Sequence, residues 1–465
     1  MLELSTICKL NLLEHSLKNM NEINGIDKKV CIIGAGLSGL SAAFDLGKLG
    51  FKVQIFESGR VTGGLASSVH VNCRPIERFY HFICKGDRDL LVLVDEIGLS
   101  DKLHWQQSKT GFFFDGKSYN FSTPFDLFRF EPVPYMQKIR FGLNVIQNRY
   151  RKSWRQLDGI AAYPWLINQI GVRAYEVIWD PLLRVKFGEY FDKISAAWIW
   201  HRIHRVASSR RRIWQPEYLG YLEYGSETII EALVDILRKM HNVEIFTEMD
   251  VRSVEVCDES VKGITIRKRQ EIIECDYVIS TVALPILSRM MPHFDLEYRK
   301  RIESIDYIGV VCGLLKLSNP ISEYFWLNVN DEDITFNGVI EYTNLNKHLR
   351  LNGKSIIYIP YYLPTNSERF SFSDEQLVNE FIDGLGRINP GFKPEWIEEF
   401  VISRAKYAQS ICTVGFADIM PEHTTPIKGL YITDSTQFYP EDRTISGAIR
   451  VGRKTAELIM QDTVL

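Results

Sequence analysis

The segment that most constrains the fold of this chain is a glycine-rich turn between an apolar strand and a helix. Strand residues 30–33 lead into Gly34, Gly36 and Gly39, which form G-x-G-x-x-G at the start of a predicted helix. In this pattern the first glycine permits a tight turn, the second lets the backbone approach a pyrophosphate and the third lets the helix pack on the strand. A second apolar strand ends at Glu57, about 20 residues further on, where a carboxylate can accept hydrogen bonds from ribose hydroxyls. The segment therefore predicts a βαβ unit that binds a dinucleotide with an unphosphorylated ribose.

The residues that follow Glu57, ESGRVTGGLASS, place the doublet Gly63-Gly64 shortly after the acid. This stretch resembles the corresponding one in the flavin amine oxidase superfamily, which includes monoamine and polyamine oxidases, protoporphyrinogen oxidase, phytoene desaturases and UDP-galactopyranose mutase. The resemblance implies that the cofactor is FAD and that the paired glycines let the chain pass close to its pyrophosphate and ribityl groups. Many amine oxidases carry an arginine directly after the doublet, whereas this chain has Leu65, so it departs from the amine oxidases proper. The FAD-binding residues that the resemblance implies in this part are Gly34, Gly36, Leu37, Ser38, Gly39, Glu57, Ser58, Arg60, Gly63, Gly64 and Leu65.

The C-terminal residues match the other half of the same pattern. A strand predicted at 429–434, GLYITD, ends in Asp434, and an amphipathic helix is predicted from Gly447 to Ile459 with Ser446 as its N-cap. The superfamily ends with a strand, an acid, a loop and a helix in this order. The resemblance implies that Asp434 binds the ribityl or pyrophosphate group. It also implies that amides at the helix N-terminus stabilise negative charge on the reduced isoalloxazine ring.

The loop between these two elements, YPEDRTIS, is expected beside the pyrimidine edge of the flavin. There Arg443 would offset negative charge at N1 and the C2 carbonyl, and Asp442 would hold Arg443 or contact the ribityl hydroxyls. Val251 stands where the family contacts adenine through backbone atoms, although a core position in a strand explains this valine equally well. The FAD-binding residues implied in this half are Val251, Asp434, Asp442, Arg443, Thr444, Ile445 and Ser446.

Composition places the chain among globular proteins. Its 465 residues are 45% hydrophobic and 24% charged, enough for a large core divided into two or three lobes. The net charge of −3 gives no basis for nucleic-acid binding. The eight cysteines show no C-x-x-C pair and no cluster with histidine, so we expect reduced thiols, a cytoplasmic protein and no metal site. The first residues lack the pattern of a secretory signal, and no apolar run of about 18 residues predicts a membrane span.

The predicted fold class is α/β, with a discontinuous, Rossmann-like FAD-binding domain, an inserted mixed-sheet substrate domain and a helical subdomain. Residues 1–28 are expected to form an N-terminal extension. The FAD-binding domain is assigned 29–95, 225–290 and 400–465, the substrate domain 96–124 and 291–399, and the helical subdomain 125–224. Strands are predicted at 310–317 and 356–362 and a helix at 374–388.

Two segments supply candidate catalytic residues. PIERFYHFI, residues 75–83, resembles the loop in UDP-galactopyranose mutase and its relatives that carries a histidine beside the flavin. The match puts His81 there, where it would orient the cofactor or move a proton, and a structural histidine is the alternative. PLLRVKFGEYFDKISAAWIWHR, residues 181–202, resembles a K-x-G-type turn and helix of the mutase and protoporphyrinogen oxidase. Arg184 and Lys186 are therefore candidates to bind a phosphate or carboxylate, with solvated helix-end charges as the alternative.

Two further segments have a functional and a simpler interpretation. The basic stretch at 201–212, HRIHRVASSRRR, would contact an anionic lipid, a nucleotide-sugar or a polyprenyl phosphate, but a solvated loop is favoured. The aromatic stretch at 125–135, FDLFRFEPVPY, would line a tunnel or enter a membrane surface, but a place in the core is favoured. Peripheral membrane contact is thus the less favoured alternative, and the oligomeric state stays open.

These observations favour an FAD-dependent oxidoreductase of the amine oxidase and protoporphyrinogen oxidase type. A small-molecule substrate, for which an anionic group is one candidate feature, would lose a hydride from carbon to flavin N5. The alternative is a non-redox mutase, in which N5 of reduced flavin attacks the anomeric carbon of a nucleotide-sugar or related glycan precursor. A requirement for pre-reduced flavin without net electron consumption would separate the two. A flavoprotein that has lost catalysis is a third interpretation, but nothing in the FAD motifs suggests decay.

Overall fold

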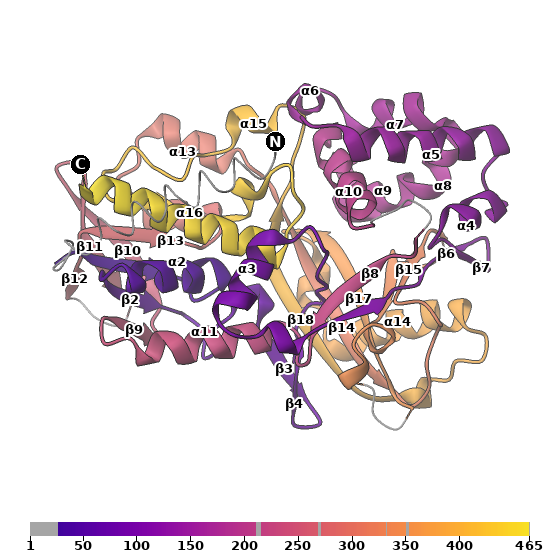
Figure 1. Cartoon of the computed structure of the whole chain (residues 1–465), viewed down its shortest axis with the longest axis horizontal. Coiled ribbons are helices and arrows are strands. Elements are labelled where there is room, and N and C mark those ends of the chain that lie inside the picture. The colour runs from indigo at the N-terminus through magenta and orange to yellow at the C-terminus, as the bar shows by residue number, and fades with distance from the viewer. Residues whose placement is uncertain (1–26, 211–214, 268–270, 332, 350–352, 465) are drawn as a thin grey trace.

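The computed structural model describes residues 27–210, 215–267, 271–331, 333–349 and 353–464, and the extension expected at 1–28 lies almost entirely outside this part. The described chain forms a parallel-sheet domain at one end of the molecule and a mixed-sheet domain at the other. A group of helices packs beside the mixed sheet (Figure 1). This arrangement confirms the predicted fold class.

The parallel sheet joins segments that are far apart in the sequence. Its strand order is β19-β13-β1-β2-β9, and every neighbouring pair is parallel. The strands are β1 (Lys29–Ile33), β2 (Lys52–Phe56), β9 (Val243–Phe246), β13 (Tyr277–Ser280) and β19 (Leu430–Ile432). In β1, Val30 and Ile32 enter one hydrophobic core and Cys31 and Ile33 enter another. Because both faces of this strand are buried, its sequence is continuously apolar.

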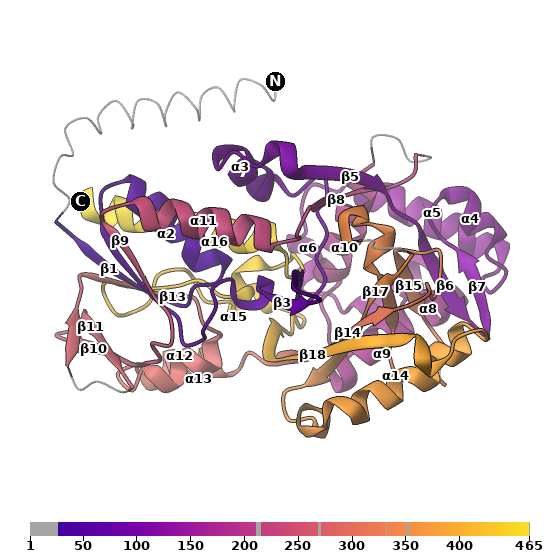
Figure 2. The same ribbon diagram turned by 90° about the horizontal axis from the view of Figure 1, so that it is seen from below.

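Helices cover one face of the parallel sheet and a small antiparallel sheet lies on the other (Figure 2). The helices are α2 (Leu37–Lys48), α11 (Glu227–Lys239) and α16 (Ile445–Val464). The small sheet comprises β10 (Val251–Cys257), β11 (Ser260–Ile266) and β12 (Ile272–Glu274), followed by α12 (Leu284–Met290) and α13 (Leu296–Glu303). α16 packs tightly on α2, since a Cβ at Gly452 would lie 2.2 Å from the carbonyl oxygen of Ser38. The last helix thus lies directly against the glycine-rich turn.

The mixed sheet of the second domain, predicted to bind the substrate, has the order β18-β14-β17-β16-β15-β6-β7, and its β15–β6 pair is parallel. Its strands are β6 (Thr110–Phe114), β7 (Lys117–Asn120), β14 (Tyr307–Leu317), β15 (Trp326–Val329), β16 (Gly338–Glu341), β17 (Ser355–Pro364) and β18 (Ile397–Ser410). The strands predicted at 310–317 and 356–362 lie within β14 and β17, and α14 (Asp374–Ile388) has the predicted bounds. The predicted domain boundary at 400 is wrong, because β18 pairs with β14 as far as Ser410.

An antiparallel ribbon connects the two domains. It consists of β5 (Leu103–Gln107) and β8 (Tyr218–Leu222), and β8 therefore falls inside the segment predicted as mainly helical. The hairpin β3 (Ser68–Val71) and β4 (Arg74–Glu77) and the helix α3 (Arg88–Glu96) precede the ribbon. Ile83 exchanges two backbone hydrogen bonds with Gly220 of β8, at 2.8 and 2.7 Å. This exchange fixes the end of the 75–83 loop to the ribbon.

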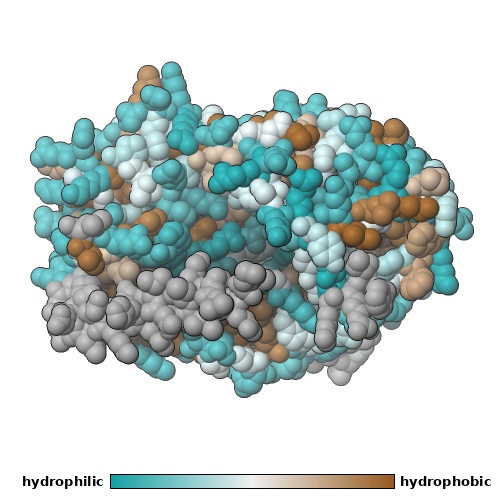
Figure 3. Space-filling view, turned by 45° about the horizontal axis from the view of Figure 1, so that its top comes forward, coloured by the Kyte–Doolittle hydropathy of each residue, from teal (hydrophilic) through white to brown (hydrophobic). Residues whose placement is uncertain are grey.

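The helical subdomain packs around Trp198, which is fully buried. Its helices are α4 (Pro124–Arg129), α5 (Tyr135–Tyr150), α6 (Arg155–Asp158), α7 (Ala162–Ile170), α8 (Val172–Ile178), α9 (Asp180–Phe187) and α10 (Ala196–Ser208); the short α15 (Phe416–Ile419) lies closer to the C-terminus. The aromatic stretch at 125–135 divides: Phe130 is buried, whereas Phe125 and Tyr135 are exposed. The favoured interpretation as core residues therefore holds for only part of the aromatic stretch. Apolar side chains also gather on the surface at the right-hand end of the molecule in Figure 3.

Among the described residues, no helix combines the length and the apolar character that crossing a membrane requires.

Candidate active site

The glycine-rich turn leaves an open surface between two stretches of backbone. Gly36 pairs with Gly63 in an isolated bridge, and a Cβ at Gly64 would lie 3.2 Å from the Cα atom of Gly36. A Cβ at Gly36 would have its nearest neighbour, the Cα atom of Gly64, at 4.0 Å, so it would make only an ordinary van der Waals contact. Gly39 serves packing instead, because a Cβ there would lie 2.2 Å from the carbonyl oxygen of Gly34. The turn therefore fits a pyrophosphate that runs along bare backbone.

Glu57 is fixed at the carboxyl end of β2, next to this turn. Its Oε2 accepts a hydrogen bond from the Ala35 amide at 2.9 Å, and Oε1 accepts one from the Gly59 amide at 2.8 Å. A carboxylate has about four lone-pair sites, so Glu57 retains capacity for ribose hydroxyls. The carboxylate and the open turn together fit the adenosine diphosphate half of FAD.

Other predicted FAD residues of this half occupy varied positions. Leu37 and Ser38 begin α2, and Ser58 and Leu65 are exposed beside the turn. Arg60 is 87% exposed and pairs with Glu248 at 3.2 Å. Val251 is buried at the start of β10, where it is paired with Ile266 of β11.

The N-cap of α16 differs from the predicted one. The helix begins at Ile445, and the Oγ1 of Thr444 accepts a hydrogen bond from the Gly447 amide at 2.8 Å. Thr444 is therefore the N-cap. Ser446 lies in the first turn, where its buried Oγ accepts from the Leu90 amide at 3.3 Å. The prediction was wrong by two residues because both side chains are good caps and the sequence alone does not show where the helix starts.

Asp434 already accepts hydrogen bonds from other groups of the protein. Its Oδ1 accepts hydrogen bonds from the Thr436 amide and the Tyr307 hydroxyl, both at 2.8 Å, and it caps the short helix η9 (Ser435–Phe438). Burial raises the pKa of Asp434, and these hydrogen bonds oppose the rise. The predicted contact with ribityl or pyrophosphate would therefore fall to Oδ2.

A charge cluster lies between α9, α10 and the loop before α16, with Lys186 buried and its partners half-buried. Lys186 Nζ lies 3.3 Å from Asp442 Oδ2, and Arg202 Nη1 contacts the same oxygen. Arg443 packs against the rings of Phe79 and Tyr362, each at 5.8 Å from the guanidinium carbon. Asp442 accepts a hydrogen bond from the Arg443 backbone amide at 3.0 Å, and its carboxylate also pairs with Lys186 and Arg202. Two cations thus pair with one carboxylate, and Arg443 adds a third positive charge nearby.

This cluster shifts the ionisation of its members. Burial above all, together with Arg202 and Arg443, lowers the pKa of Lys186 to about 8 against the opposing effect of Asp442. Burial alone would raise the pKa of Asp442, but Lys186, Arg202 and Arg443 bring it well below its usual range. Near neutral pH the cluster therefore carries more positive than negative charge.

The cluster opens into a cleft with aromatic walls. Two of the lining tyrosines, Tyr80 and Tyr362, share a hydrogen bond between their hydroxyls at 2.8 Å. His81 lines the same cleft, and its Nδ1 lies 3.5 Å from Oε1 of the buried Glu77. Glu77 is itself held by the Tyr342 hydroxyl at 2.5 Å and the Ser226 amide at 2.9 Å. The cleft is lined by Tyr80, His81, Phe82, Asp87, Leu90, Leu182, Lys186, His201, Arg202, Arg205, Val206, Trp326, Asn328, Asn337, Gly338, Pro360, Tyr362, Asp442, Arg443, Thr444 and Ile445.

The structure brings His81 and Lys186 together but leaves Arg184 outside. The Arg184 side chain is 55% exposed, pairs with Asp180 at 2.7 Å and stacks on Phe191. Residues two apart on a helix point in different directions, so α9 turns Lys186 inward and Arg184 toward solvent. The prediction that both bind one anion is therefore wrong for Arg184.

Several lining residues were missed as site candidates. α10 places His201, Arg202 and Arg205 against the cleft, so the favoured solvated-loop interpretation is wrong for this part of the stretch, and residues 211–212 lie outside the described chain. Arg205 pairs with Asp87 at 2.9 Å. Burial, followed by Arg205, lowers the pKa of His201 to about 3, so this ring is neutral. Helical spacing of basic residues next to buried tryptophans was the signal that could have identified them.

The chain combines a Rossmann-like sheet, a bare glycine turn and a charged cleft at the N-terminus of its last helix. These are the features expected of an FAD-dependent enzyme. Residues 37–460 match the family described as flavin containing amine oxidoreductase. The chain belongs to this family; it is an FAD-dependent oxidoreductase, and its cofactor is FAD.

Individual relatives resemble the chain along most of its length. It is 19% identical to a 15-cis-phytoene desaturase of Synechococcus elongatus, over 93% of this chain and 96% of that protein. The crystal structure of a putative protoporphyrinogen oxidase from Exiguobacterium sp. 255-15 superposes with a TM-score of 0.73 at 18% identity, covering 94% of this chain and 99% of that one. Reduced UDP-galactopyranose mutase gives a TM-score of 0.73 at 17% identity, covering 93% and 96%. At these identities the solved structures establish the fold.

Proposed function

We propose that this enzyme oxidises a small anionic molecule. The observation that carries the proposal is the charge cluster, in which Lys186 and Arg202 pair with the carboxylate of Asp442 and Arg443 adds a third positive charge nearby. Even if Arg443 serves the flavin, Lys186 and Arg202 share one carboxylate, which leaves positive charge for a carboxylate or phosphate of the substrate. Charge-assisted hydrogen bonds to such a group are strong in a cleft that excludes water.

The residues of the chain would bind and orient the substrate rather than perform the redox step. FAD, when bound, would supply that chemistry as the acceptor of a hydride from the substrate. Lys186 and Arg202 would anchor the anion, and the rings of Tyr80, Tyr362 and Trp326 would exclude water from the reacting carbon. Glu77 would fix the orientation of the His81 ring, which would then accept or return a proton during the reaction.

Anaerobic reduction of the enzyme-bound flavin tests this function. The oxidised holoenzyme is mixed without oxygen with amines, alcohols, porphyrinogens and unsaturated carboxylates, each paired with its neutral ester or amide where one exists. We expect the visible flavin band to bleach with an anionic compound and much more slowly with its neutral partner. Bleaching that is equally fast for both members of a pair would contradict an anionic substrate.

Replacing His81 with alanine is expected to leave FAD bound and to slow turnover by about 10²-fold, the usual size of a general acid–base contribution. The ring lines the cleft, whereas His70 is exposed on β3, so His70→Ala is the matched control. The measurement is kcat together with the ratio of visible to ultraviolet absorbance. Unchanged kinetics in His81→Ala would remove this residue from the reaction.

The non-redox mutase remains a second candidate, because the same excess of cations suits the diphosphate of a nucleotide-sugar. The mutase named among the similar structures shares the fold. Dithionite-reduced enzyme is incubated with UDP-sugars, and the products are separated by chromatography. Isomerisation without net consumption of electrons would favour this candidate, and its absence would leave the oxidoreductase.

We also propose the cytoplasm as the location of the protein. The seven cysteines in the described residues are all free, and five of them are buried. Thiols in this state suit a reducing compartment. Cell fractionation with antibody detection tests this assignment.

A further inference from the structure

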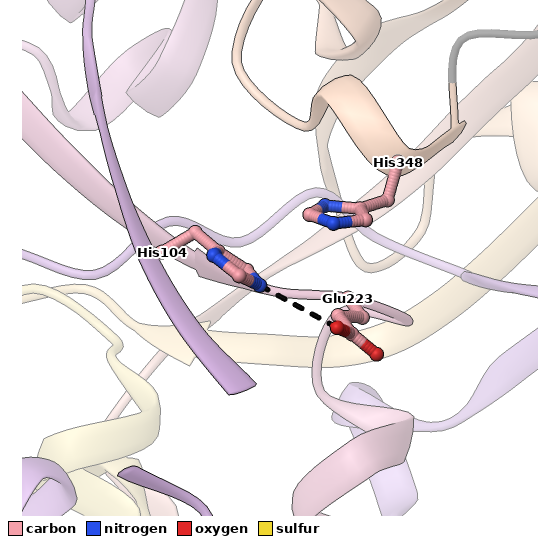
Figure 4. Close-up of side chains that lie close together, drawn as sticks. All are labelled: His104, Glu223 and His348. Atoms are coloured by element: carbon pink, nitrogen blue, oxygen red, sulfur yellow. Dashed lines mark ion pairs between the residues drawn. The ribbon is translucent and has the colours of Figure 1, made fainter. Parts of the chain in front are cut away.

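Three side chains that commonly bind metals converge outside the cleft described above. His104 lies on β5, Glu223 directly follows β8, and His348 lies in the short helix η6 (Lys347–Leu349). Their potential ligand atoms all lie within 4.8 Å of one another. Figure 4 shows the three side chains approaching one another from three separate backbone segments. No local sequence spacing indicates this cluster, which explains why no metal site was predicted.

The spacing of the cluster is close to that of a tetrahedral metal site. His104 Nε2 lies 3.5 Å from Glu223 Oε1 (dashed in Figure 4). Ligands at about 2.0–2.2 Å from a tetrahedral zinc ion are roughly 3.4 Å apart, so this pair already has the required separation. The His104 and His348 rings lie with centroids 4.5 Å apart. His348 is exposed, and a small rotation of its side chain would bring the third ligand into place.

The bonding of His104 also points to a missing partner. Its Nε2 is buried and has no hydrogen-bond partner among the described residues, although it faces the Glu223 carboxylate. Buried polar nitrogens in folded proteins are nearly always paired. A cation between His104 and Glu223 would satisfy both groups at once.

The backbone that carries these ligands is already fixed. β5 pairs with β8 in a register that places His104 opposite Tyr221. Asn346, two residues before His348, donates from Nδ2 to the carbonyl oxygens of Leu222 and Glu223, both at 3.2 Å. A site whose supporting backbone is preorganised loses little entropy when the ion binds.

We propose that His104, Glu223 and His348 bind a divalent transition-metal ion of the zinc type, with water as the fourth ligand. Two neutral imidazoles and one carboxylate are a set that zinc accepts. The ion would fasten η6, at the edge of the substrate domain, to the β5–β8 ribbon. That ribbon holds Ile83, two residues after His81, so the ion would stabilise the cleft without contacting the substrate.

Zinc titration of the FAD-loaded enzyme tests the site. The protein is prepared without a histidine tag, treated with EDTA, dialysed and titrated with ZnCl₂ by calorimetry. We expect one ion per chain, a rise in the thermal midpoint on binding, and X-ray absorption that shows two imidazole ligands at about 2.0–2.1 Å. His348→Ala should bind at least about tenfold more weakly, as loss of one of three protein ligands predicts.

Two further variants, one at a ligand and one control, complete the test. Glu223→Gln preserves shape and removes the charge, so it should weaken binding as well, whereas His293→Ala changes an exposed histidine elsewhere and should bind like wild type. Absence of saturable binding at one ion per chain would overturn the proposal. Equal affinity in wild type and His348→Ala would also overturn it, and would leave His104 and Glu223 as an ion pair.

Discussion

Replacing Gly36 with valine is expected to give a folded protein that no longer retains FAD. The nearest atom to a Cβ at position 36 is 4.0 Å away, so the fold itself tolerates a side chain there. That side chain would nevertheless fill the gap beside Gly64 through which the pyrophosphate passes. We expect the affinity for FAD to fall by more than about 100-fold, which corresponds to about 2.7 kcal/mol.

The visible-to-ultraviolet absorbance ratio after gel filtration measures FAD retention, and circular dichroism checks the fold. Gly142→Val is the matched control. A Cβ at Gly142 would meet open space, and this residue lies in α5 of the helical subdomain. Gly39→Ala should behave differently, since its Cβ would lie 2.2 Å from a carbonyl oxygen and would disturb the fold itself. A fully yellow Gly36→Val protein would contradict the assigned role of the turn.

The parts of the fold that could be predicted are those whose constraints are local. The glycine turn, the apolar strands on either side of it and the amphipathic helix at 374–388 each carry a short-range pattern. β8 and the end of β18 could not be placed, because their pairing with β5 and β14 depends on residues that are far away in the sequence. The domain boundary at 400 failed for that reason.

The same distinction applies to the site. Arg443 and Thr444, which the sequence places next to the FAD motifs, line the cleft, because chain connectivity fixes their position. Arg184 and Lys186 were treated alike, because the sequence does not show which face of α9 is buried. Arg202 was missed because its partner, Asp442, is far away in the sequence. Tertiary packing determined the positions of Arg184, Lys186 and Arg202.

Replacing Lys186 with methionine is expected to leave FAD bound and to lower kcat/KM for the substrate by at least about 100-fold, or about 2.7 kcal/mol. Lys186 is 4% exposed and lies over the rings of Trp198 and Tyr362, at 4.8 and 4.9 Å, so an apolar side chain of similar length fits the same space. What methionine removes is the buried positive charge that we assign to the substrate anion. Arg184→Met is the matched control, because Arg184 lies two residues away on the solvent side of α9 and should retain nearly full activity.

The pH dependence of the same pair of variants makes this prediction specific. The groups around Lys186 act in opposite directions: burial, Arg202 and Arg443 lower its pKa, Asp442 raises it, and the balance lies at about 8. Because kcat/KM reports the free enzyme, it should fall in wild type and in Arg184→Met as the pH rises through about 8 and the lysine loses its proton. In Lys186→Met this fall should disappear, since methionine does not titrate. If the fall persisted in that variant, another group would control it, and Lys186 would not be the cation that binds the substrate.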